Sequence, residues 1–356
     1  MGRRGGGRLR LPHALGEPPR RPGRPAAVAP RPCRRRSLGR RRRRARAGPV
    51  TAPFSEGSIH TEDGLRLHYR DYAAAAAGRA PVVCLPGLTR CCRDFEMLAE
   101  ALAPKRRVIC PDMRGRGGSD HDPDPAHYNV VTETGDVLRL CAMLHLGPAV
   151  FVGVSRGGLQ TMLIAEIAPQ ALAGAVLVDV GPKLERRGLL RIVATLGLAP
   201  DRYASWEAAA EALKAAHGAQ FPKLSDAEWR AFARRLYAEI DGAPAREFDW
   251  KLIAATEAAV GEEIPTLWPQ FDALAAFPLL VIRGALSDIL STETLDEMAR
   301  RAPALRSVTL PDRGHTPFLD EPAALAAIDA LLEEIDAAWP PPPPTAKKPT
   351  PSTTTP

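Results

Sequence analysis

The sequence of 356 residues has little of what a membrane or secreted protein needs. Its longest apolar stretches, such as residues 149–154 and 173–178, are far shorter than the roughly 18 residues of a membrane-spanning helix. No apolar segment of about 7 to 15 residues lies among the charges of residues 1–50, so a secretory signal is not expected there.

The sequence also lacks the cysteine pairs that hold metals or build disulfide frameworks. Its six cysteines form no Cys-x-x-Cys pair, and most lie in apolar runs, which predicts reduced, buried thiols and a cytoplasmic protein. There is no His-x-x-x-His motif and no separate glycine loop of the kind that cradles phosphate. We therefore expect neither a metal nor a cofactor.

Positive charge is abundant but confined to one end. Residues 1–50 hold 17 of the 48 basic residues and one of the 41 acidic ones, so residues 51–356 carry 31 basic and 40 acidic side chains, a net charge of −9. The first 50 residues, rich in Arg, Pro and Gly, are predicted to be disordered, as is the Pro- and Thr-rich segment 340–356. An acidic body would repel phosphate groups, so nucleic acid could bind only through the basic tail.

Between these tails, short apolar runs alternate with amphipathic helical stretches, the pattern of a mostly parallel sheet covered by helices. Residues 58–71 predict a hairpin that turns at Asp63 and Gly64. The alternation stops over residues 182–277, where helical periodicity continues without a good strand. We interpret this segment as a helical cap, inserted into a core made of residues 51–181 and 278–339.

The most informative motif is the Gly-x-Ser-x-Gly of residues 153–157, which stands between a strand-like run and a helix. In such a nucleophile elbow the glycines permit a tight turn and the serine, here Ser155, is exposed at the end of the strand. The helix that follows directs its NH groups toward developing negative charge. Ser155 is therefore the candidate nucleophile.

A serine nucleophile needs a base and a carboxylate, and both follow at the ends of later strand-like runs. His315 follows the last run and Asp288 the run before it, in the chain order Ser, Asp, His. Asp179, at the end of an earlier run, is the alternative acid. We predict Asp288 as the acid because it stands in a polar loop directly after an apolar strand.

With these motifs, residues 59–332 resemble the α/β-hydrolase superfamily, in particular its cap-bearing serine hydrolases and acyltransferase-like members. The loop at residues 85–88 and the Asp-x-Arg-Gly-x-Gly-x-Ser turn at residues 112–119 are similar to family motifs, and the turn is taken as architectural. The resemblance implies an eight-stranded, mostly parallel sheet with the cap after the sixth strand. It also implies an oxyanion hole made of the backbone NH groups of Leu88 and Arg156.

The side chains of Arg90 and Arg156 could bind a substrate carboxylate, or could point to solvent or pair with acids of the cap. The sequence as a whole predicts a serine hydrolase that cleaves an ester, lactone or related acyl bond of a small molecule. Two alternatives use the same triad: carbon–carbon bond hydrolysis and acyl transfer. A third, of another class, is a nucleic-acid or surface-binding protein that acts through its basic tail.

Overall fold

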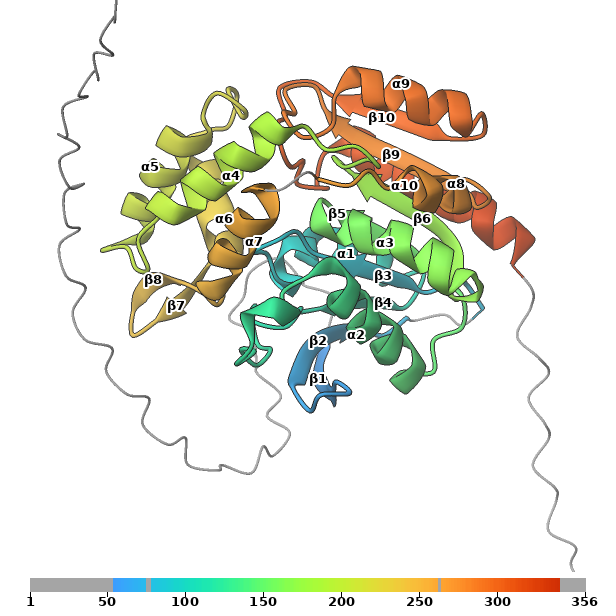
Figure 1. Ribbon diagram of the computed structural model, residues 1–356, viewed down its shortest axis with the longest axis horizontal. Coiled ribbons are helices and arrows are strands. Elements are labelled where there is room, and N and C mark those ends of the chain that lie inside the picture. Colours follow the sequence, from blue (N-terminus) through green and yellow to red (C-terminus); the bar gives the residue numbers. More distant parts are fainter. Residues whose placement is uncertain (1–53, 75–77, 262–263, 340–356) are drawn as a thin grey trace, which may run out of the picture. The chain divides into compact units, whose positions relative to one another are not determined.

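A computed structural model describes residues 54–74, 78–261 and 264–339, and the two predicted tails lie outside these residues. Eight strands form one sheet in the order β1-β2-β4-β3-β5-β6-β9-β10 (Figure 1). The strands are β1 (Ser55–His60), β2 (Arg66–Tyr72), β3 (Val82–Leu85), β4 (Val108–Pro111), β5 (Ala149–Val154), β6 (Leu172–Val178), β9 (Leu279–Gly284) and β10 (Arg306–Leu310). β1 and β2 pair antiparallel, β2 is antiparallel to β4, and the remaining pairs are parallel.

Strand β5 shows why the centre of the sheet is buried on both faces. Its six residues are all buried, and alternate side chains point to opposite faces, as a strand requires. Ala149 and Phe151 join one apolar cluster, and Val150, Val152 and Val154 join another. The core is therefore two apolar layers divided by the sheet.

Helices cover each face of the sheet. The first cluster receives side chains of α2 (Val130–Met143), α3 (Arg156–Ile167), α8 (Trp268–Leu274) and α9 (Thr292–Arg301). The second receives side chains of α1 (Glu96–Leu102) and α10 (Pro322–Ala338), together with the short 3-10 helix Cys92–Phe95. The predicted fold class is confirmed, and the predicted hairpin turns at Gly64, whose φ of +87° suits glycine.

Residues 186–261, the greater part of the segment between β6 and β9, form the cap, on the left in Figure 1. It contains α4 (Arg186–Leu198), α5 (Trp206–His217), α6 (Asp226–Leu236) and α7 (Lys251–Gly261). Its own apolar cluster includes Leu213, Trp229 and Phe232, and is completed by Phe318 from the loop after β10. The cap is therefore packed against the part of the core that follows the last strand.

Two details of the predicted cap are wrong. A hairpin of β7 (Tyr237–Ile240) and β8 (Ala243–Arg246) interrupts the helices, although no strand was expected. It turns at Asp241 and Gly242, which have φ of +49° and +77°, so the Asp-Gly dipeptide was a usable sequence signal. Helix α8 places Phe271 and Leu274 in the core cluster under α3, so it covers the sheet although it lies within residues 182–277.

The structure bears on two features that the sequence analysis did not expect, a membrane-spanning helix and disulfide bonds. Among the described helices, none combines the length and apolar character required to cross a membrane. The five cysteines in the described ranges are buried free thiols, as predicted: Cys84, Cys91, Cys92, Cys110 and Cys141. The sixth, Cys33, lies outside the described residues.

Candidate active site

The turn from β5 into α3 is as tight as the glycine motif predicts. Ser155 has φ of +51° and ψ of −113°, a strained conformation for a residue with a side chain. A Cβ atom on Gly153 would lie 2.5 Å from the carbonyl oxygen of Gly157, and one on Gly157 would lie 2.2 Å from that of Leu85. Glycine is therefore required on both sides of Ser155.

His315 connects Ser155 to a carboxylate. Its Nε2 lies 2.9 Å from Ser155 Oγ, and its Nδ1 lies 2.7 Å from an oxygen of Asp179. The three residues follow the carboxyl ends of β5, β10 and β6, the edge at which open parallel sheets place their sites. Only 6% of the His315 side chain and none of the Asp179 side chain is exposed, so the pair is shielded from water.

The prediction that Asp288 lies beside His315 is wrong, and the alternative acid, Asp179, holds that place. The loop after β9 does reach the site, but through Ser287, whose hydroxyl donates to Asp179 at 2.7 Å. The next residue points away: Asp288 binds Arg191 at 2.5 and 2.9 Å and Gln220 at 2.9 Å. Two neighbouring residues of this loop thus point in different directions: Ser287 reaches Asp179, and Asp288 reaches Arg191.

Asp179 is fixed by hydrogen bonds from the β9 loop as well as by His315. Its second oxygen accepts from the backbone NH of Gly284 at 2.8 Å. The residue adopts φ of +53°, which turns the chain directly after β6. An aspartate tolerates this left-handed conformation better than most residues do. The sequence analysis named Asp179 only as the alternative acid and did not foresee these longer-range contacts.

The predicted oxyanion residues belong to two segments that meet at Ser155. A Cβ on Gly87 would lie 3.8 Å from the Cβ of Ser155, so the loop after β3 runs against the elbow. Arg156 is the first residue of α3, where a backbone NH has no partner in its own helix. Within the described ranges, the NH groups of Leu88 and Arg156 have no hydrogen-bond acceptor.

The suggested carboxylate-binding role of the two arginine side chains finds no support in their contacts. The Arg156 guanidinium points into the core, where it binds Glu133 at 2.7 and 3.1 Å and the carbonyl of Tyr128 at 2.9 Å. Arg90 is bonded to Asp94, and its guanidinium carbon lies 5.2 Å from the centre of the Phe232 ring. Each cation is thus paired with an acid of the core, rather than of the cap.

The cap adds three polar side chains beside His315 that the sequence analysis did not single out. Arg191 and Gln220 hold Asp288, and a Cβ on Gly314, next to His315, would meet the Gln220 side chain at 2.4 Å. His217 is largely buried, and burial together with the positive charges of Arg191 and Arg90 lowers its pKa to about 4. No local sequence pattern marks these residues, because only the packing of the cap brings them to the site.

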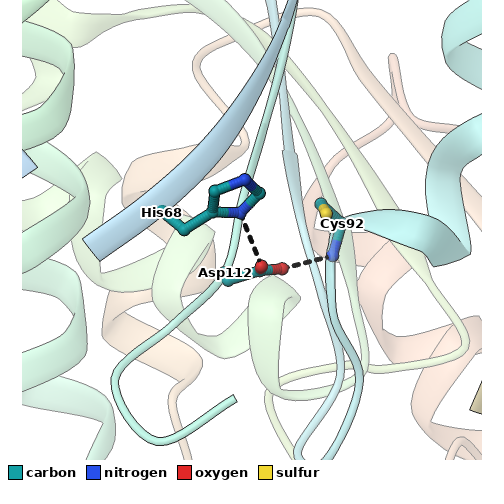
Figure 2. A group of neighbouring side chains, drawn as sticks. All are labelled: His68, Cys92 and Asp112. Atoms are coloured by element: carbon teal, nitrogen blue, oxygen red, sulfur yellow. Dashed lines mark hydrogen bonds and ion pairs between the residues drawn. The ribbon is translucent and has the colours of Figure 1, made fainter. Parts of the chain in front are cut away.

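Among the residues that the structure describes, two groups of side chains have ligand atoms close enough to share a metal ion. His68, Cys92 and Asp112 form one group (Figure 2), and Asp63, Asp122 and His127 form the other. The Asp112 carboxylate already accepts from His68 at 2.8 Å and from the NH groups of Cys92 and Gly118 at 2.6 and 2.9 Å. In the second group, Asp63 and Asp122 both bind the guanidinium of Arg114.

These contacts explain both groups without a metal. Asp112 ties the turn of residues 112–119 to the start of the 3-10 helix Cys92–Phe95, which fits the architectural role that the motif predicts. Arg114 supplies the positive charge between the carboxylates of the second group, and it also binds Asp136. The candidate chemistry of the chain therefore centres on Ser155.

Comparison with known proteins assigns the chain to a family. The model of the alpha/beta hydrolase family matches residues 82–328. The chain belongs to this family. Among curated relatives of this alpha/beta hydrolase, the 3-hydroxybutyrate-oligomer hydrolase of Cupriavidus necator is 35% identical over 73% of this chain and 90% of its own length.

Two further relatives of this alpha/beta hydrolase extend the comparison. The sn-1-specific diacylglycerol lipase ABHD11 of Mus musculus is 30% identical over 80% of this chain and 92% of its own length. A crystal structure of an alpha/beta hydrolase from Novosphingobium aromaticivorans is 44% identical, covers 80% of this chain and 99% of its own, and superposes with a TM-score of 0.75. The chain is thus an enzyme whose named relatives include ester hydrolases.

Proposed function

We propose that this alpha/beta hydrolase is a serine hydrolase that cleaves carboxylic esters through an acyl-enzyme on Ser155. The observation that carries the proposal is the continuous set of contacts from Ser155 Oγ through the imidazole of His315 to Asp179, at 2.9 and 2.7 Å. A serine hydroxyl is a weak nucleophile until a base accepts its proton, and His315 Nε2 lies at the distance that this transfer needs.

In the proposed reaction, Ser155 Oγ attacks the ester carbonyl while its proton moves to His315 Nε2. Asp179 stabilises the resulting imidazolium and keeps the other ring nitrogen protonated. The NH groups of Leu88 and Arg156 stabilise the oxyanion. The tetrahedral intermediate collapses as His315 gives its proton to the leaving alcohol, and water then cleaves the acyl-enzyme by the same route.

We further propose that the substrates include small esters of hydroxy acids. The support is the 35% identity to a relative named for 3-hydroxybutyrate oligomers, which extends over 90% of that relative. Such oligomers are linear esters, so their cleavage needs only the acyl-transfer chemistry described above.

A fluorophosphonate probe and a panel of esters test the proposal. We expect intact-mass analysis to show one probe per chain, attached to Ser155. Ser155→Ala should abolish labelling and lower kcat by roughly six orders of magnitude, as removal of a triad nucleophile does. The panel should contain 3-hydroxybutyrate dimers and trimers, together with simple acyl esters of graded length. Undiminished hydrolysis by a clean Ser155→Ala preparation would contradict the mechanism.

A further inference from the structure

The two halves of the oxyanion hole are joined by a buried ionic network behind the elbow. Glu133, on α2, has no exposed surface, and Arg116, in the turn after β4, is 1% exposed. The carboxylate of Glu133 accepts from Arg116 at 2.7 Å and from Arg156 at 2.7 and 3.1 Å. Gln160 of α3 donates to the same carboxylate at 3.0 Å. These four hydrogen bonds match the accepting capacity of one carboxylate.

Each arginine in this network is attached to one side of the oxyanion hole. Arg156 contributes its backbone NH to the hole, and its side chain is held by Glu133. Arg116 donates from Nε to the carbonyl oxygen of Leu88 at 2.8 Å, and Leu88 contributes the other NH. Glu133 therefore connects two segments that are far apart in the chain, the loop after β3 and the elbow after β5.

We propose that Glu133 and Arg116 are positioning residues, which together with the Arg156 side chain fix the two oxyanion donors relative to Ser155. This inference rests on the proposed function. Oxyanion donors act only when they lie about 2.7 to 3.1 Å from the developing charge, so a small movement of either loop reduces their effect. Leu88 lies in a loop without regular secondary structure, where a fixed carbonyl restricts the orientation of the residue.

The net charge of this network also supports stabilisation of the oxyanion. Two guanidinium groups and one carboxylate leave a net charge of +1 directly behind the site where negative charge develops. Burial acts to raise the pKa of Glu133, but Arg116 and Arg156 outweigh it and keep that pKa below its ordinary value. Glu133 is thus ionised at neutral pH, and the excess positive charge favours the oxyanion.

The decisive variant is Arg156→Met, because it retains the backbone NH and leaves Glu133 paired with Arg116. With an ester that the wild type cleaves, we expect kcat to fall about 10- to 100-fold while KM changes by less than about threefold. The inhibition constant of a boronic acid, which forms a tetrahedral adduct on the serine, should rise by the same factor as kcat falls. Arg156→Lys should recover part of the loss. Glu133→Gln should give the same pattern as Arg156→Met, provided that it folds.

Asp336→Asn is the matched control. Asp336 on α10 holds the buried Arg106 at 2.7 and 3.2 Å, and Arg106 precedes β4 at the opposite, amino end of the strands. This variant should lower the melting temperature and leave kcat unchanged.

The outcomes separate the two proposals. If Arg156→Met lowers only the melting temperature, with kcat and boronic acid binding equal to those of the wild type, the positioning role is wrong and the proposed function stands. If the wild type neither reacts with a fluorophosphonate nor cleaves any ester, the proposed function fails and the positioning role fails with it.

Discussion

Asp179 is completely buried, and its carboxylate accepts hydrogen bonds from three groups on two segments: Gly284, Ser287 and His315. A carboxylate held in this way orients the imidazole and selects its tautomer. Asp179→Asn should leave the chain folded and lower kcat by about four orders of magnitude, the loss that follows when the histidine is held in the wrong tautomer. Steady-state kinetics and a thermal melt check both expectations.

Asp288→Asn is the control variant for the prediction about Asp179→Asn. Asp288 is partly exposed and contacts Arg191 and Gln220 rather than His315. Burial acts to raise its pKa, but the hydrogen bonds and positive charge of Arg191 lower it overall. Loss of the Asp288–Arg191 ion pair should reduce kcat by about tenfold or less, in line with a peripheral change in geometry. If Asp288→Asn, rather than Asp179→Asn, lowered kcat by about four orders of magnitude, the assignment of Asp179 as the acid beside His315 would be wrong.

His217 makes the stability of the protein sensitive to acid. Its pKa is about 4, whereas an unfolded chain binds the proton with a pKa near 6.5. Between these values the unfolded state binds more protons, so the free energy of unfolding should decrease as the pH falls from about 6.5 to 4 and be insensitive to this group above that range. Urea denaturation at several pH values measures the effect. His217→Gln should reduce the slope, and an unchanged slope would contradict the prediction.

At the scale of elements, the β5–α3 junction allows little change because backbone approaches backbone. Gly157→Ala would place a Cβ 2.2 Å from the carbonyl oxygen of Leu85, so we expect it to lower the free energy of unfolding by about 3 kcal/mol or more. Denaturant unfolding measures this directly. Activity should also be lost, because the same junction presents Ser155.

Gly135 provides the matched control for this prediction. It lies on the exposed side of α2, and nothing is within 4 Å of a Cβ placed there. Gly135→Ala should raise the free energy of unfolding by about 0.5 to 1 kcal/mol, because alanine has the higher helix propensity. Equal effects of the two substitutions would show that steric contact at the elbow is not the reason for its glycines.

For the whole molecule, the separation of charge leads to a prediction about the tails. Residues 1–50 carry a net charge of +16 and residues 51–356 carry −9. Deletion of residues 1–50 and 341–356 should leave kcat/KM and the melting temperature nearly unchanged, because neither segment has the apolar residues to bury much surface. A large loss of stability would show that a tail packs on the enzyme. Binding of nucleic acid, if any, should disappear with the basic tail and weaken steeply with salt.

The sequence by itself predicted most of the elements and two of the three side chains that the structure joins by hydrogen bonds, Ser155 and His315. The predicted alternation of short strands and amphipathic helices is observed in the core, because apolar periodicity and capping are local properties. Ser155 directly follows β5 and His315 lies in the loop after β10, and these positions made both residues candidates. The β7–β8 hairpin was missed even though its Asp241-Gly242 turn is also a local signal.

Only the tertiary structure decided which carboxylate meets His315. Asp179 and Asp288 both follow strands of the central sheet, so their positions in the chain do not distinguish them. The choice depends on the direction of one loop, which points Ser287 toward the triad and Asp288 toward the cap. Long-range contacts set that direction, as they set the approach of Glu133 to Arg116 and Arg156. Such contacts join segments far apart in sequence, and no local pattern encodes them.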